Sequence, residues 1–277
     1  MILYVVPTPI GNLGDITYRA IEVLKECDVI LCEDTRCSFK MLNYYGIKKK
    51  LVSYHKFNEF KLLNKIIEEI QSGVKYCLIS DAGMPGISDP GKILINKCIE
   101  EEIKVDVLPG ACALINSVVL SGFNDNIFTF IGFLPRTTKE LKNTISLMKT
   151  IHTMQVIYES PHRLVKTLEL ISNEFGNNIP IYIGRELTKL FEENFRGTAT
   201  EALNYFNNGK IRGEFVLCIN NTKQQNEKTI SEEEIMEIFL YNEEKYKLTT
   251  KKNIEKICLE YNLKKNYVYQ LVIKKIE

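Results

Sequence analysis

The chain has 277 residues, of which 45% are hydrophobic, and this length is sufficient for two domains with separate cores. No run of about 18 apolar residues occurs, which excludes a membrane-spanning helix. The apolar segment 2–6 has no basic segment before it and no small-residue cleavage site after it. We therefore expect a first strand instead of a signal peptide, and a cytoplasmic protein. A net charge of +1 excludes binding of nucleic acid through overall charge alone.

The first half of the chain alternates short apolar runs with amphipathic stretches. Strands are predicted at 2–6, 29–33, 51–54, 76–80 and 105–108, and helices at 17–26, 36–45, 59–71 and 92–101. Gly46 and Gly73 follow two of these helices, where a glycine typically ends a helix. Alternation of this kind predicts a largely parallel sheet with helices on both faces.

A second α/β segment begins near Asn126. Its predicted strands are 128–133, 154–159, 181–185, 195–198 and 213–219, and its helices are 139–150, 162–175 and 200–208. A polar linker follows Asn220, and the remaining residues read as two or three helices. We therefore predict three parts: an N-terminal α/β domain at 1–121, a second α/β domain at 122–221, and a linker with a helical tail at 222–277.

The eight cysteines include no CxxC pair. Cys27, Cys32 and Cys37 are evenly spaced, but this spacing crosses a predicted helix, strand and helix, and three scattered histidines offer no evident fourth ligand. We expect no metal site, and cysteines that are reduced, small and buried.

Three loops rich in glycine and proline each follow a predicted strand and precede a helix, at 7–15, 80–91 and 108–113. In a parallel sheet, loops at the carboxyl ends of the strands line one crevice, where ligands bind. The alternative is that they are plain turns. The second loop has twelve residues, whereas connections in α/β units usually have about two to six, and this favours a binding role. Neither a GxGxxG nor a GxxxxGK[ST] pattern occurs, which argues against NAD, FAD or ATP as the main ligand.

These loops and several later strings resemble the tetrapyrrole methylase superfamily. Within it, they are most similar to the 16S ribosomal RNA 2′-O-ribose methyltransferases known as small subunit methyltransferase I. The strings are PTPIGNLGDIT at 7–17, CEDTR at 32–36, SDAGMPGISDPG at 80–91, LPGACA at 108–113, GFLPR at 132–136, YESPHRL at 158–164, GRELTKLFEE at 184–193 and GEFVL at 213–217.

The resemblance implies the fold of a class III methyltransferase, in which two α/β domains hold S-adenosylmethionine in the cleft between them, usually in a homodimer. It also implies 2′-O-methylation of a cytidine in the decoding centre of 16S rRNA in the small ribosomal subunit. The positions that match cofactor contacts are Ile10, Asp81, Met84, Cys112, Ala113, Tyr158, Glu214 and Phe215. The first loop departs from the superfamily, because Pro7 and Pro9 stand where glycines are common.

Methyl transfer to a ribose hydroxyl requires a group that aligns the hydroxyl and takes or stabilises its proton. Candidates at predicted strand ends are Glu33, Asp34, Arg36, Glu159, His162, Arg163, Arg185 and Glu186. We assign Glu33 and Arg36 to substrate positioning and Glu159 to an orienting role. The alternatives are structural: Glu33 or Asp34 caps a helix, and Glu159 pairs with Arg163. No general base follows from the sequence.

The segment 251–275 has apolar positions that suit two short helices joined near Asn262, in a helix-turn-helix arrangement like the small helical domain of the same family. Its lysines and tyrosines suit RNA phosphates and stacking, and a solvated helical face is the alternative. Two rival functions stay open: C-methylation of a corrin or porphyrin precursor, and RNA binding in ribosome assembly without catalysis.

Overall fold

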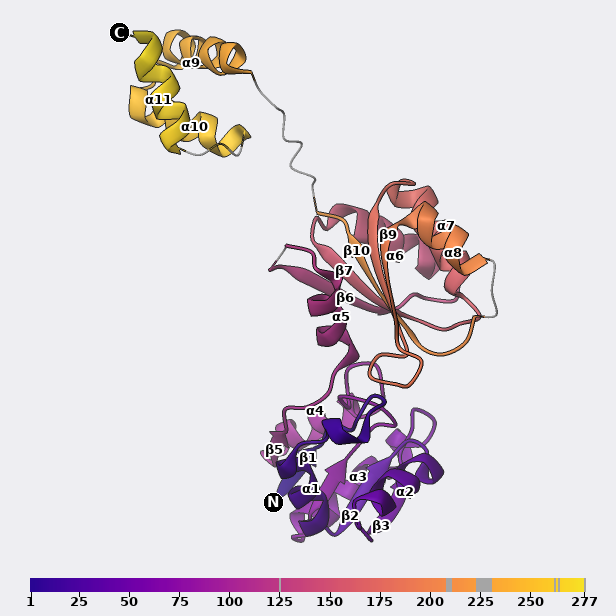
Figure 1. Cartoon of the computed structure of the whole chain (residues 1–277). Coiled ribbons are helices and arrows are strands. Elements are labelled where there is room, and N and C mark those ends of the chain that lie inside the picture. Colours follow the sequence, from indigo (N-terminus) through magenta and orange to yellow (C-terminus); the bar gives the residue numbers. More distant parts are fainter. Residues whose placement is uncertain (125, 208–210, 223–230, 262, 264, 277) are drawn as a thin grey trace. The chain divides into compact units, whose positions relative to one another are not determined.

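The computed structural model describes residues 1–124, 126–207, 211–222, 231–261, 263 and 265–276 (Figure 1). The chain forms two compact units, Met1–Asn221 and Thr222–Glu277. The first unit contains both predicted sheets, and a division of this unit between residues 121 and 122 stays a prediction. Within the described residues, no helix has the length and apolarity needed to cross a membrane.

The first sheet is parallel throughout, with the strand order β3-β2-β4-β1-β5. Its strands are β1 (Ile2–Val5), β2 (Val29–Cys32), β3 (Lys50–Ser53), β4 (Tyr76–Leu78) and β5 (Lys104–Val107). Its helices are the short η1 (Leu13–Asp15), α1 (Tyr18–Glu26), α2 (Thr35–Tyr44), α3 (Glu59–Gln71) and α4 (Lys92–Glu100). The inner strand β2 is buried along its whole length, as expected for a sheet covered on both faces.

Helices cover the two faces of the first sheet in pairs. Leu24 of α1 and Leu42 of α2 pack in one core with Ile30, whereas Ile67 of α3 and Leu94 of α4 pack in another. Because β2 and β3 are adjacent parallel strands, the loops that lead from them into α2 and α3 meet at their carboxyl ends. This edge of the sheet carries the candidate site described below.

The second sheet is mixed, with the order β6-β7-β10-β8-β9. Its strands are β6 (Phe128–Phe133), β7 (Met154–Glu159), β8 (Pro180–Arg185), β9 (Glu193–Thr198) and β10 (Phe215–Asn220), and only β6 and β7 are parallel. The helices α6 (Thr138–Thr150), α7 (Leu164–Phe175) and α8 (Ala199–Asn207) cover one face, and α5 (Ala113–Ser121) covers the other. The predicted fold of two α/β sheets is confirmed.

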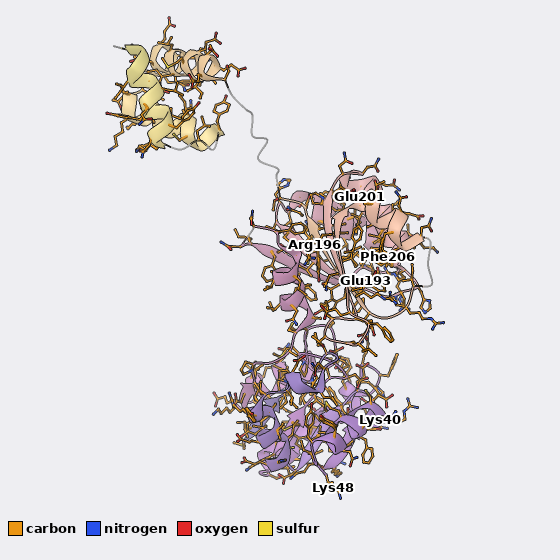
Figure 2. The ribbon with its side chains drawn as sticks, in the orientation of Figure 1. Lys40, Lys48, Glu193, Arg196, Glu201 and Phe206 are labelled. Atoms are coloured by element: carbon orange, nitrogen blue, oxygen red, sulfur yellow. The ribbon has the colours of Figure 1, made fainter. Side chains whose placement is uncertain are left out.

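Arg196 of β9, labelled in Figure 2, contacts both α5 and a strand of this sheet. Its Nε donates a hydrogen bond to the carbonyl oxygen of Leu120 at 3.0 Å, and its guanidinium lies 5.1 Å from the ring centroid of Tyr182. This contact holds the C-terminal end of α5, whereas its N-terminal end follows the third glycine-rich loop.

A bulge interrupts the outer strand β6. The pairing with β7 skips Ile131, so that Phe130 lies opposite Val156 and Phe133 lies opposite Tyr158. Gly132 supplies the positive φ of 78° at this point. Alternation would place Phe130 and Phe133 on opposite faces, but the bulge brings both rings against Tyr158, with centroid distances of 5.0 and 5.7 Å.

The second compact unit contains α9 (Glu232–Tyr246), α10 (Thr250–Tyr261) and α11 (Lys265–Ile276) around a small apolar core. Helix α9 begins with a capping box between Ser231 and Glu234. A buried amide pair joins α9 to α10, because Asn242 donates to Asn253 at 3.0 Å. Asn262, where we predicted the joint between two helices, lies outside the described residues.

Candidate active site

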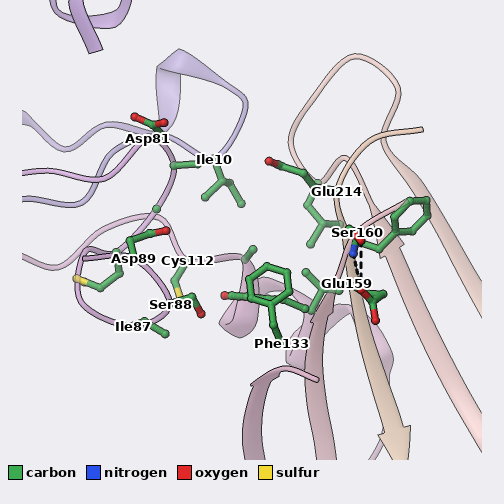
Figure 3. Close-up of a pocket in the computed structure, with 18 of the residues that line it drawn as sticks. Ile10, Asp81, Ile87, Ser88, Asp89, Cys112, Phe133, Glu159, Ser160 and Glu214 are labelled. Carbon is green, nitrogen blue, oxygen red and sulfur yellow. Dashed lines mark hydrogen bonds between the residues drawn. The ribbon is translucent and has the colours of Figure 1, made fainter. Parts of the chain in front are cut away.

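A cavity of about 370 Å³ lies between the loops of the first sheet and the strand ends of the second (Figure 3). We call it the donor cavity. From the first sheet it is lined by Ile10, Asp81, Ala82, Gly83, Met84, Ile87, Ser88, Asp89, Cys112 and Ala113, and from the second by Phe133, Tyr158, Glu159, Ser160, Pro161, Leu187, Lys189, Glu214, Phe215 and Val216. All eight residues predicted to contact a cofactor are among them, and contact with a cofactor itself stays a prediction.

Backbone and hydroxyl hydrogen bonds join the first two glycine-rich loops. Thr8 and Gly83 exchange both backbone hydrogen bonds at 3.0 Å, and the Thr8 hydroxyl donates to the carbonyl of Ser80 at 3.1 Å. Gly83 has a φ of +78°, and a Cβ there would lie 3.1 Å from the side chain of Ile10. These contacts fix the apolar side of the donor cavity.

The third loop packs on the first through Pro7, one of the two prolines at which the first loop departs from the superfamily. A Cβ on Gly110 would lie 2.7 Å from Cβ of Pro7, so backbone and proline ring are in direct contact. The loop then continues into α5, whose first turn is held by the second sheet: the backbone N–H of Leu114 donates to the Tyr158 hydroxyl at 3.2 Å. Burial raises the pKa of Tyr158, so this hydroxyl stays protonated at neutral pH.

Glu159 lines the donor cavity, and its carboxylate is held by neighbouring protein groups. It accepts a hydrogen bond from the backbone N–H of Ser160 at 2.8 Å (Figure 3). It also accepts one from the Thr167 hydroxyl at 2.6 Å, and Nε of Arg163 lies 3.7 Å from it. The structural alternative considered for Glu159 is therefore present in the fold. These contacts give the residue a way to orient Ser160 and Pro161, which line the donor cavity.

The loop after β8 brings the two sheets into contact. Lys189 lies 2.9 Å from a carboxylate oxygen of Glu186 and 2.8 Å from one of Glu214. The Thr188 hydroxyl accepts a hydrogen bond from the backbone N–H of Asn12 in the first loop at 3.0 Å. A Cβ on Gly11 would lie 2.3 Å from Lys189, so only glycine fits at this contact.

Asp89 is a functional candidate that the sequence did not single out, although it belongs to the second glycine-rich loop. Burial, together with the negative charges of Glu33, Asp81 and Glu214, raises the pKa of Asp89 to about 6. A carboxylate kept in such surroundings is unfavourable alone but favourable beside a positively charged ligand. A cavity with apolar walls and several acidic side chains therefore suits a ligand that has a flat apolar part and positive charge.

A second hollow, of about 520 Å³, adjoins the donor cavity at Asp81. We call it the side groove. It is lined by Glu33, Asp34, Thr35, Arg36, Ser53, His55, Lys56, Phe57 and Asp81. The structure thus places Glu33 and Arg36 together here, apart from Glu159, which lines the donor cavity.

The two alternatives for the acidic pair at the side groove are now distinguished. Asp34 is the cap of α2, because it accepts a hydrogen bond from the backbone N–H of Arg36 at 2.8 Å, and it also pairs with the Arg36 guanidinium at 2.7 Å. Glu33 is not part of this cap. Burial raises the pKa of Glu33, and the charge of Asp81 raises it further, whereas Lys56 and His55 lower it.

The cysteines, His162 and Arg185 are not gathered at one site. Five of the eight cysteines are buried as expected, whereas Cys112 and Cys258 are half-buried. Cys37 is exposed, so the expectation is wrong for it, because it lies on the outer side of α2. His162 is exposed, and Arg185 pairs with Glu193 at 2.9 Å. Within the described part of the chain, no three His, Cys, Asp or Glu side chains are grouped as metal ligands would be.

Comparison with known proteins identifies the family of this fold and site. The family model of tetrapyrrole (corrin/porphyrin) methylases matches residues 2–203. The chain belongs to the tetrapyrrole methylase family. This methylase is 47% identical to the protein named ribosomal RNA small subunit methyltransferase I of Mesomycoplasma conjunctivae, over 77% of the chain and 89% of that relative. It is 41% identical to the Bacillus subtilis protein of the same name, over 97% of the chain and 92% of the relative, which confirms the predicted resemblance.

Solved structures share the fold of the methylase at low sequence identity. Diphthine synthase has a TM-score of 0.62 and 14% identity, over 79% of this chain and 89% of that one. Uroporphyrin-III C-methyltransferase of Thermus thermophilus, in complex with S-adenosylhomocysteine, has a TM-score of 0.57 and 14% identity, over 79% and 97% of the two chains.

Proposed function

We propose that this tetrapyrrole methylase transfers the methyl group of S-adenosylmethionine to the ribose 2′-hydroxyl of a cytidine in the decoding centre of 16S rRNA. The names of its relatives support ribosomal RNA of the small subunit as the substrate. The observation that carries the proposal is the meeting of two hollows at Asp81, one for a methyl donor and one for an acceptor.

S-adenosylmethionine is the cofactor, in agreement with the family and with the S-adenosylhomocysteine complex of the Thermus relative. Ile10, Met84, Cys112, Ala113, Tyr158 and Phe215 form the walls that would hold it, with Asp81 and Glu214 at polar positions. When bound, it supplies an electrophilic methyl carbon and leaves as a neutral thioether. The acidic side chains of the donor cavity favour the positively charged donor over its neutral product.

The acceptor hydroxyl is a weak acid, so the protein must help to remove its proton. We assign this role to Glu33, which lines the side groove next to Asp81 and whose pKa is raised by burial. The hydroxyl oxygen forms its bond to the methyl carbon, the carbon–sulfur bond breaks, and the proton passes to the Glu33 carboxylate. Arg36, held by Asp34, orients the substrate beside it.

We further propose a homodimer and contact between the helical tail and RNA. Exposed apolar side chains on β5 and α5 support the dimer: Val107, Ile115 and Val119 are 51%, 48% and 74% exposed. Sedimentation of the Val119→Glu variant tests the dimer.

In the tail, Lys251 and Lys252 are exposed at the start of α10, where they could contact RNA. RNA binding by the double variant Lys251→Glu/Lys252→Glu tests this contact. Unchanged affinity for RNA would mean that the tail is only a solvated helical face.

The decisive experiment incubates the protein with methyl-labelled S-adenosylmethionine and either small ribosomal subunits or uroporphyrinogen. We expect label in the 16S rRNA, at one cytidine whose 2′-O-methylation is absent from cells that lack the gene. Label in the tetrapyrrole instead would establish C-methylation. Tight cofactor binding without turnover on subunits in any state of maturation would favour an assembly factor.

A further inference from the structure

The outer wall of the side groove is a short loop between β3 and α3, and the proposed reaction leaves it without a role. Its residues His55, Lys56 and Phe57 line the groove together with the β2–α2 loop that carries Glu33. Asn58 holds the loop in shape: its side chain donates to the carbonyl of Ser53 at 2.9 Å and accepts from the backbone N–H of His55 at 2.8 Å. The loop is therefore a fixed wall.

Phe57 presents a nearly free aromatic face at the side groove. Its side chain is 93% exposed, and its ring lies edge-to-face with His55 at a centroid distance of 6.0 Å. A single exposed phenylalanine is ordinary on a surface. This one, however, lines a hollow that adjoins the donor cavity, and such a ring is suited to stacking against a flat ligand.

The charges of the side groove change from one wall to the other. Glu33 and Asp81 provide carboxylates on the inner wall, and the charge of Asp34 is matched by Arg36. Lys56 lies on the outer wall and is exposed, with no ion pair to any described side chain. A ligand fits these charges if its hydroxyl group lies at the inner wall, beside the carboxylates, and its negative group lies at the outer wall, beside Lys56.

We propose that the side groove is the subsite for the acceptor nucleotide, with its base stacked on Phe57, a flanking phosphate at Lys56 and its ribose hydroxyl directed to Glu33 and Asp81. This inference rests on the proposed function and adds the residues that recognise the substrate. The nucleotide must be unpaired, because stacking on a side chain requires a base removed from its helix. Lys56 serves as a phosphate contact and Phe57 as a stacking platform, and neither takes part in the proton transfer.

The experiment compares Phe57→Ala, Phe57→Trp and Lys56→Ala with the control Tyr44→Ala in steady-state methylation of small ribosomal subunits. Tyr44 is also an exposed aromatic, at 68%, but it ends α2 at the opposite end of the helix from the groove. We expect Phe57→Ala to raise the KM for subunits about tenfold or more, as for loss of a stacked base. Phe57→Trp should restore it, and Tyr44→Ala should leave it unchanged.

Two further measurements distinguish an acceptor subsite from an indirect effect on the donor cavity. Calorimetry should give the same affinity for S-adenosylmethionine in all four variants, because neither Phe57 nor Lys56 lines the donor cavity. Lys56→Ala should reduce the slope of log affinity for RNA against log salt by about one.

The inference is overturned if Phe57→Ala and Tyr44→Ala have the same KM, or if Phe57→Ala weakens cofactor binding instead of subunit binding. Its failure is distinct from failure of the proposed function. If the subsite inference fails, the wild-type protein still methylates subunits and the Phe57 and Lys56 variants do so equally well. If the proposed function fails, the wild-type protein itself transfers no methyl group to RNA.

Discussion

The backbone N–H of Asp34 donates a hydrogen bond of 3.1 Å to the Asp81 carboxylate. Asp34 belongs to the loop after β2 and Asp81 to the loop after β4, so this bond joins the wall of the side groove to the wall of the donor cavity. Neighbouring strands bring the two loops together, since β2 pairs directly with β4. Under the proposed function, the relative position of donor and acceptor would depend on one carboxylate that lines both hollows.

Replacing Asp81 should therefore affect both substrates, whereas replacing Glu33 should affect one. We expect Asp81→Ala to weaken the binding of S-adenosylmethionine and to raise the KM for RNA. Asp81 lines both hollows, and its loss removes the hydrogen-bond acceptor of the Asp34 backbone. Glu33→Gln should bind the donor normally and lose about 100-fold or more in kcat, as for removal of a general base. Calorimetry and single-turnover methylation measure the two effects. If wild type and Asp81→Ala bind S-adenosylmethionine with equal affinity, Asp81 does not contribute to the donor cavity as proposed.

Asp89 should couple pH to stability. Its pKa of about 6 in the folded chain lies above the ordinary 3.8, so the folded state binds the proton more tightly. The stabilisation by this proton is complete below about pH 4 and is lost as the pH rises through 6. We expect Asp89→Asn to be more stable than wild type at pH 7, by about 1–2 kcal/mol after allowance for solvent screening, and to bind the donor more weakly. Urea denaturation at pH 4.5 and 7 checks the sign, and a variant less stable at pH 7 would refute it.

Glu159→Gln should distinguish orientation from catalysis. In Glu159→Gln the amide oxygen can still accept the hydrogen bond from the backbone N–H of Ser160, and the amide NH2 can donate to the Thr167 hydroxyl instead. We therefore expect kcat to fall less than about fivefold, whereas a general acid or base would lose 100-fold or more. Glu159→Ala should cost about 3 kcal/mol of stability, because the buried Thr167 hydroxyl and Arg163 lose their partner. Denaturation and single-turnover rates on both variants decide between the two roles.

The bulge at Gly132 should matter for donor binding beyond its effect on stability. Gly132→Ala places a side chain on a residue with a φ of 78°, which costs about 1–2 kcal/mol of stability. We expect the variant to shift Phe133 and to lower the affinity for the methyl donor severalfold. Gly176→Ala is the matched control, since Gly176 has a φ of 102°, open space around it and no place in the donor cavity. If both variants bind the donor as wild type does, Phe133 is not directed by the bulge.

The sequence predicted all ten strands within two residues of their ends, because each is a short apolar run bounded by turn residues. The helix at 59–71 was predicted with its observed ends, since Gly73 and an amphipathic pattern mark it. Strand pairing was less accessible. Nothing local to 213–219 shows that β10 lies between β7 and β8 and runs antiparallel to both, because pairing depends on contacts between distant segments.

The sequence predicted the site residues that belong to family motifs. It did not predict those whose role depends on packing between distant segments. The family strings led to Ile10, Asp81 and Met84, all of which line the donor cavity. Asp89 was overlooked because its raised pKa depends on burial and on three carboxylates that are far away in sequence or elsewhere in its own loop. Phe133 was overlooked because an unbroken strand pattern would turn its ring away from Tyr158.

Gly11 allows the first glycine-rich loop to touch the loop after β8. Its backbone lies against Lys189 with no space for a methyl group, and the neighbouring Asn12 is bonded to Thr188, so the first loop and the loop after β8 touch directly. We therefore expect the two loops to keep the same spacing with and without the methyl donor. The entropy of ordering these walls would then be lost once, during folding, instead of at every turnover.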